Sequence, residues 1–86
     1  MFSITFTNPF GVAIQLQVSA GQYQNCDQNG TVYNGQLGPN ASWTLNSDQN
    51  VVCWRRTANP GQPGSPFNQW GTFSPNDINT PANIQL

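Results

Sequence analysis

The sequence lacks histidine, lysine and glutamate, and its 86 residues include only two arginines and three aspartates. Without histidine or lysine, the chain has no imidazole for general base catalysis or zinc binding near neutral pH, and no amine for a Schiff base. Two arginines are also too few for the basic surface with which proteins bind nucleic acids or anionic lipids. These absences predict a protein that is not an enzyme and that binds no metal, cofactor or nucleic acid.

Long hydrophobic runs are missing as well. No stretch approaches the roughly 18 consecutive apolar residues that a transmembrane helix needs, so the sequence predicts no membrane span. The first seven residues alternate between apolar and hydroxyl side chains, unlike the basic and then continuously apolar start of a signal peptide. We therefore expect either a protein made without a secretion signal or one whose signal has been removed.

Asparagine and glutamine are abundant instead, with 12 Asn and 10 Gln in the chain. An exposed amide offers donors and an acceptor for hydrogen bonds without carrying charge. The formal net charge of −1 gives little electrostatic repulsion between copies of the chain. This composition favours a neutral, polyhydroxylated partner such as a glycan, and it leaves a homo-oligomer as an alternative.

Apolar and polar residues alternate along much of the chain, a pattern typical of β-strands with one buried face. The alternation predicts strands over 2–7 and 12–18, joined into an antiparallel hairpin by the turn Asn8-Pro9-Phe10-Gly11. The dipeptide Asn34-Gly35 predicts a second hairpin turn, between short strands at 31–33 and 36–37.

The rest of the chain continues this pattern of short strands and turns. Ser19–Gly30 is expected to be a polar loop. Further strands are expected over 41–46, 51–57, 68–73 and 82–86, with a Pro- and Gly-rich surface loop over 58–67 and a turn or single 3₁₀ turn over 74–79. No helix of two or more turns is expected. The fold class is therefore all-β, a small antiparallel β-sandwich or barrel that forms one domain over residues 1–86.

Two cysteines, Cys26 and Cys53, are an even count in a small domain, and we expect them to form a disulfide. The bridge would close a loop of 27 positions and stabilise the fold by roughly 3 kcal/mol. The alternative is that both cysteines are reduced and buried. A disulfide would favour a secreted protein.

The three carboxylates, Asp27, Asp48 and Asp77, all fall in predicted turns, where Asp is a common residue. Asn25–Gly30 is similar to the first half of a calcium-binding loop, but Gln36 stands where such a loop needs a bidentate Glu. We therefore interpret this segment as a hydrogen-bonded turn.

The strand expected at 51–57 contains the most informative aromatic residue. Val51 and Cys53 fall on one face of this strand, and Val52, Trp54 and Arg56 fall on the other. If the first face is buried, an indole lies exposed beside a guanidinium, an arrangement that suits stacking on a sugar ring. If the register is reversed, Trp54 belongs to the core. A third arrangement stacks Arg56 on Trp54 as a cation–π pair.

These residues lead to a functional prediction of a non-catalytic, lectin-like or defence-type domain that binds a neutral glycan. The predicted site combines exposed aromatic rings with polar side chains, namely Trp54, Trp70, Tyr33, Tyr23, Arg56, Asp27 and Asp48. A structural or self-associating β protein that uses the aromatic residues as subunit contacts is the alternative. An inhibitor or toxin that inserts the 58–67 loop into its target is a third possibility.

The runs QLGPNASWTL at 36–45 and CWRRT at 53–57 resemble the N-terminal half of thaumatin-like (osmotin-type) proteins, which also open with a strand ending in Asn, here Phe6-Thr7-Asn8. The resemblance covers roughly residues 4–57. It implies a β-sandwich and contact with a polysaccharide. The family has many disulfides and an acidic cleft, whereas this chain has two cysteines and no Glu, so no catalytic residue is carried over.

Overall fold

The computed structural model describes residues 2–73 and 83–86, and the turn expected at 74–79, with Asp77, lies outside this part. The described elements are β1 (Phe2–Thr7), β2 (Ile14–Gly21), the 3₁₀ helix η1 (Cys26–Gln28), β3 (Gly30–Leu37), β4 (Ser42–Ser47), β5 (Val51–Arg56), β6 (Gly71–Phe73) and β7 (Asn83–Gln85). Within these residues no helix is long and apolar enough to cross a lipid bilayer.

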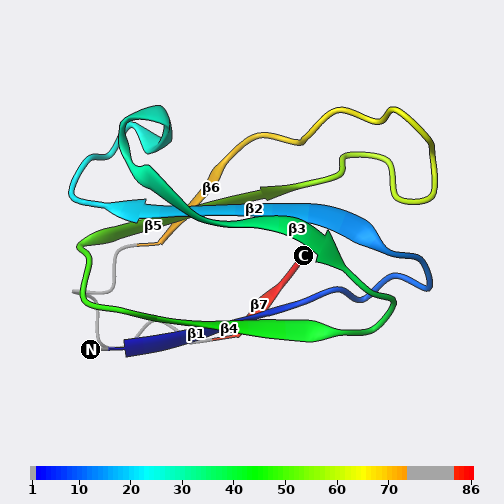
Figure 1. The fold of residues 1–86 in the computed structure, drawn as a ribbon, viewed down its shortest axis with the longest axis horizontal. Helices are drawn as coiled ribbons and strands as arrows, with labels where there is room; N and C mark the ends of the chain where they lie inside the picture. Colours follow the sequence, from blue (N-terminus) through cyan, green and yellow to red (C-terminus); the bar gives the residue numbers. More distant parts are fainter. Residues whose placement is uncertain (1, 74–82) are drawn as a thin grey trace.

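The strands form two sheets that pack face to face (Figure 1). One sheet has three strands in the order β4-β1-β7, and the other has four in the order β3-β2-β5-β6. The all-β prediction is confirmed, and the two separate sheets make the fold a sandwich and not a closed barrel. The pairing is antiparallel throughout except between β1 and β7, which run parallel.

The predicted hairpin between the first two strands is wrong. β1 pairs with β4 and β7, whereas β2 pairs with β3 and β5, so the segment between β1 and β2 crosses from one sheet to the other. Alternation shows which face of each strand is apolar, but it does not show whether two such faces lie side by side or opposite each other. Here they lie opposite, and Phe6 and Leu16 are both fully buried between the sheets.

Asn8, at the start of this crossing, is fully buried and has all its side-chain hydrogen bonds satisfied. Its Nδ2 donates to the carbonyl oxygens of Val12, Leu37 and Gly38. Its Oδ1 accepts a hydrogen bond from the Phe10 backbone N–H. A buried amide is costly unless it is hydrogen-bonded, so these four bonds hold the crossing segment against the end of β3.

The predicted turn at Asn34-Gly35 is also wrong, because both residues lie within the continuous strand β3. Asn34 is opposite Gln17 and Gly35 is opposite Leu16 in the pairing with β2. A two-residue hairpin turn of the favoured type needs positive φ values, and Gly35 has none. Pairing along the whole length of β2 outweighs the local preference of the dipeptide for a turn.

The remaining boundaries differ from the predictions mainly in length. β2 continues to Gly21, η1 lies in the expected polar loop, and the strand expected at 68–73 is reduced to β6. The strand expected at 82–86 is observed as β7. The segment after β5 is an extended loop, as predicted, and a bridge between Thr57 and Phe67 closes it.

The core lies between the two sheets. Its buried apolar residues are Ile4, Phe6, Ile14, Leu16, Val18, Leu37, Leu45 and Val52. Trp43 is half-buried and stacks on Phe6 with 6.0 Å between ring centroids, so it lies on the core side of β4. A second, smaller cluster on the other side of β5 contains Val51 and the two cysteines.

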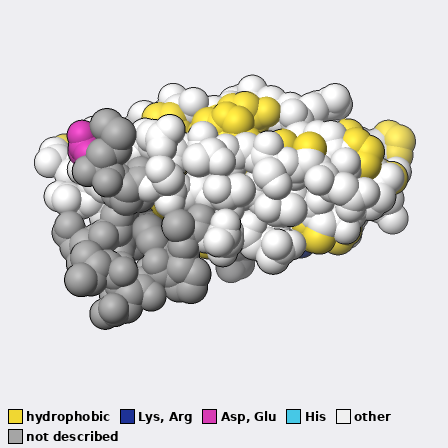
Figure 2. Space-filling model, turned by 90° about the horizontal axis from the view of Figure 1, so that it is seen from below, with side chains coloured by type: hydrophobic (Ala, Val, Ile, Leu, Met, Phe, Trp, Pro, Cys, Tyr) yellow, Lys and Arg dark blue, Asp and Glu magenta, His cyan; other side chains and the backbone are white. Residues whose placement is uncertain are grey.

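The outer face of the three-stranded sheet carries a ladder of polar side chains between β1 and β4. Thr5 and Thr44 hydroxyls are 2.9 Å apart, as are those of Thr7 and Ser42. The Ser3 hydroxyl donates to Asn46 Oδ1. Figure 2 views the molecule from this side and shows mostly uncharged polar surface.

Candidate functional site

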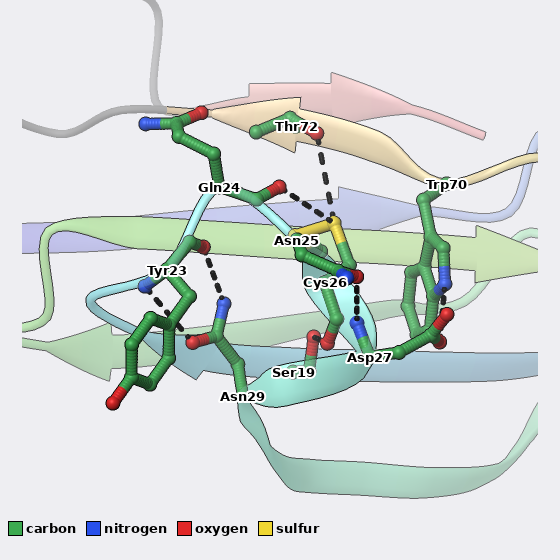
Figure 3. The surroundings of a disulfide bond; sticks show 10 residues. Ser19, Tyr23, Gln24, Asn25, Cys26, Asp27, Asn29, Trp70 and Thr72 are labelled. Atoms are coloured by element: carbon green, nitrogen blue, oxygen red, sulfur yellow. Dashed lines mark hydrogen bonds between the residues drawn. A yellow bond between two sulfur atoms is a disulfide. The ribbon is translucent and has the colours of Figure 1, made fainter.

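A disulfide joins Cys26 to Cys53, with 5.8 Å between the Cα atoms. It attaches η1 to the outer face of β5, the face turned away from the three-stranded sheet (Figure 3). Both half-cystines are buried, and Val51 is buried beside them. The predicted disulfide is therefore present, and it covers one end of this outer face.

Trp70, just before β6, packs against the disulfide cluster. Its indole Nε1 donates a hydrogen bond to Asp27 Oδ1 at 3.2 Å (Figure 3). The Asp27 backbone N–H in turn donates to Asn25 Oδ1, which caps the start of η1. The structure thus brings together two of the predicted site residues, Trp70 and Asp27.

A guanidinium that is not among the predicted site residues completes this cluster. The Arg55 Cζ atom lies 4.3 Å from the Trp70 ring centroid and 4.7 Å from that of Phe67. Arg55 Nε donates to Gln17 Oε1 at 2.6 Å. We call Phe67, Arg55 and Trp70 the Arg55 stack. Among residues 2–73 and 83–86, no carboxylate forms an ion pair with Arg55.

Four amide side chains continue the same outer face along β2 and β3. Gln15 is opposite Gln36, and Gln17 is opposite Asn34. Gln15 Nε2 donates to Asn34 Oδ1 at 3.0 Å. Directly opposite residues of an antiparallel pair share a face, so these amides form a neutral polar row beside the Arg55 stack.

A pocket of about 310 Å³ opens at the end of this row, under the loop that follows β5. Its polar lining includes Gln15, Gln36, Thr57, Gln62 and Ser65, and no charged residue lines it.

The loop over this pocket is held by hydrogen bonds. The Ala58 backbone N–H donates to the Pro66 carbonyl, and the Asn59 backbone N–H donates to Ser65 Oγ. The loop turns with the help of Gly61 and Gly64, whose φ values are +86° and +74°.

Trp54 and Arg56 do not belong to this site, and the predicted exposed face at Trp54 is wrong. The Trp54 ring lies 5.8 Å from that of Phe6, on the core side of β5. A Cβ atom on the opposite residue, Gly71, would lie 2.6 Å from the indole, so the ring occupies the space that a side chain would need. The alternative register, with Trp54 in the core, is the observed one.

Arg56 stacks on Phe10 and not on Trp54, with its Cζ atom 4.9 Å from the Phe10 ring centroid. Its guanidinium donates to the Thr57 carbonyl, at 2.6 Å. Because Val51, Val52 and Cys53 are all buried, both faces of β5 are covered at this end. Alternation alone could not identify the outer face of such a strand.

Tyr33 is half-buried, which corrects its expected exposure. Its ring lies 4.5 Å from that of Trp43 in the other sheet, and its hydroxyl donates to the Gln36 carbonyl. Its position opposite Val18 places it on the core side of β3.

Tyr23 is exposed, as predicted, but lies on the other side of the disulfide from Trp70 (Figure 3). The Asn29 side chain holds it in place by bonding both its backbone N–H and its carbonyl. Tyr23 therefore does not join the site around Trp70. Asp48 lies in the turn between β4 and β5.

No family model, curated protein or solved structure matches this chain. The resemblance to thaumatin-like proteins therefore stays a prediction.

Proposed function

We propose that this protein is a non-catalytic carbohydrate-binding domain that binds glycan on the outer face of its four-stranded sheet. The observation that supports this most directly is the pocket under the loop after β5, because its polar lining consists of amides, hydroxyls and backbone groups without charge. Such groups match sugar hydroxyls, which both donate and accept hydrogen bonds.

The Arg55 stack provides the apolar part of the proposed site. Trp70 and Phe67 are both half-buried, so part of each residue is exposed to solvent. Aromatic rings offer contact area at low entropic cost and suit the apolar faces of sugar rings. Trp70 replaces Trp54 as the aromatic residue on which the proposal depends.

A titration of glycans against matched glutamine variants tests the proposal. We expect Gln36→Ala with Gln62→Ala to weaken binding about tenfold, since each lost hydrogen bond contributes about 0.5–1.5 kcal/mol. Gln85→Ala is the control, because Gln85 is an exposed amide on β7 in the other sheet. A glycan array that stays blank at high protein concentration, or unchanged affinity in the double variant, would contradict the proposal.

Self-association is the second candidate, and an exposed edge strand favours it. β3 lies at the edge of the four-stranded sheet, carries no charged residue, and exposes 46% of Val32. Uncharged edge strands can pair with another chain. Sedimentation velocity at two concentrations tests this candidate, and a monomer at the higher concentration would exclude it.

A further inference from the structure

Arg55 is a fixed cation that forms no ion pair with a carboxylate in the part of the chain that the structure describes. Its Nε is bound to Gln17, and its plane is in contact with two aromatic rings. Neither contact neutralises the charge. A half-buried guanidinium has lost part of its hydration, so an additional anionic partner would interact with it more strongly than with a fully solvated arginine.

The contacts within the Arg55 stack also hold the guanidinium in an arrangement that suits a carboxylate partner. Guanidinium groups bind carboxylates through two parallel N–H···O bonds. With Nε used by Gln17, the terminal nitrogens Nη1 and Nη2 have no partner among residues 2–73 and 83–86. The two rings restrict the side chain before binding, so a ligand would immobilise little additional chain.

Two contacts place this cation next to the pocket. Thr57, which lines the pocket, forms a bridge with Phe67 of the Arg55 stack. Gln17, which binds Arg55, is two residues along β2 from Gln15 of the pocket lining, and residues spaced by two share a strand face. The two sites therefore adjoin on one surface.

We propose that the glycan bound on this face is acidic, and that Arg55 binds the carboxylate of a uronic acid residue while the neutral pocket holds hydroxyls of the neighbouring sugar. This inference rests on the proposed carbohydrate-binding function and specifies its ligand class. The sequence predicts a neutral glycan because the chain has so few charges. The structure places one of these charges, unpaired by any described residue, beside the pocket.

Asp27 provides a second test of the proposal, because removing its negative charge should have the opposite effect on binding from removing the positive charge of Arg55. Its carboxylate accepts a hydrogen bond from Trp70, whose ring contacts Arg55, so a bound anion would lie about one indole away from a negative charge. Asp27→Asn keeps a side-chain oxygen for Trp70 and removes the repulsion. Binding of an acidic glycan should therefore become stronger in this variant.

Isothermal titration with a uronic acid tetrasaccharide, its carboxyl-reduced neutral counterpart and a short acidic peptide tests the inference. We expect the acidic sugar to bind at least about tenfold more tightly than the neutral one, with an advantage that declines as salt is added. Binding of the neutral sugar alone, or of both sugars equally, would overturn the acidic ligand but leave the proposed function standing. Binding of neither sugar would overturn both, and equal binding of the peptide would exclude sugar specificity.

Three variants locate the effect. Arg55→Gln should weaken binding of the acidic sugar at least about tenfold more than binding of the neutral one, whereas Asp27→Asn should increase acidic binding a few-fold. Arg56→Gln is the matched control, because it removes the same charge from a residue that contacts Phe10 on the core side of the strand. Equal losses in the two arginine variants would assign the effect to net charge and overturn the role of Arg55. Circular dichroism and unfolding in urea establish that each variant is folded.

Discussion

The two outer faces of the sandwich are built from similar polar residues but differ in how those residues are paired. On the three-stranded sheet, hydroxyls and an amide meet across β1 and β4 in register, so Thr5 bonds Thr44 and Thr7 bonds Ser42. On the four-stranded sheet, the Arg55 stack, the disulfide and the pocket interrupt the regular pattern. On the first face the polar side chains of β1 and β4 bond one another, whereas the second face leaves some hydrogen-bonding groups available to a ligand.

The difference shows why composition alone says little about function in this chain. Both faces are rich in neutral polar groups, and the four-stranded face adds a pocket and a fixed cation to them. A long loop and the 3₁₀ helix lie over that face and supply Phe67, Trp70 and Asp27. The contrast between the faces can be tested from the largest expected effect to the smallest.

Reduction of the disulfide should have the largest effect. The bridge closes a loop of 27 positions, so its loss should lower the free energy of unfolding by roughly 3 kcal/mol. Urea unfolding with and without reductant measures the change, and Cys26→Ala with Cys53→Ala is the matching variant. A loss below about 1 kcal/mol would mean that the four-stranded face does not depend on this link.

Replacement of two tryptophans should separate packing from binding. Trp54→Ala removes a half-buried ring from the edge of the core. It should lower the free energy of unfolding by about 2 kcal/mol, which is less than the loss expected for a fully buried ring. Trp70→Ala should cost less stability but abolish glycan binding, because Trp70 lies on the outer face. Urea unfolding measures the stability of both variants, and glycan titration measures their affinity. Loss of binding in a folded Trp54→Ala protein, with Trp70→Ala unaffected, would contradict the assignment.

The hydroxyl ladder should give the smallest effect. Thr5→Val with Thr44→Val replaces both partners of one exposed hydrogen bond with side chains of similar shape and high strand propensity. We expect the free energy of unfolding to change by about 0.5 kcal/mol or less and the glycan affinity to remain the same. Any marked loss of glycan affinity in a folded double variant would move the binding face to the three-stranded sheet.

Local features of the sequence predicted the strands and the disulfide but not their arrangement. The alternation at Ile14–Val18 correctly identified a strand with one buried face. The partner of that strand was wrong, because pairing depends on contacts between residues far apart in the chain, such as Leu16 with Arg56. Asn34-Gly35 failed as a turn for the same reason.

The candidate site was only partly predictable. Trp70 and Asp27 were selected from the sequence, and they are hydrogen-bonded to each other in the structure. Arg55 was missed because residues 51–54, which precede it on the same strand, are apolar on both faces. An arginine next to a tryptophan gives no indication of which of the two faces outward. The pocket could not be predicted either, since it needs a loop folded over a distant strand pair.

The sequence by itself determined the chemistry that this protein can use: neutral amides and hydroxyls, few charges and one pair of cysteines. It also determined the strand content, because alternation with a period of two follows directly from β geometry. Only the tertiary structure decided which strands share a sheet and which face of β5 is turned outward. The physical reason is that a strand with apolar residues on both faces has no preferred side until η1 and Trp70 cover one face and the opposite sheet covers the other.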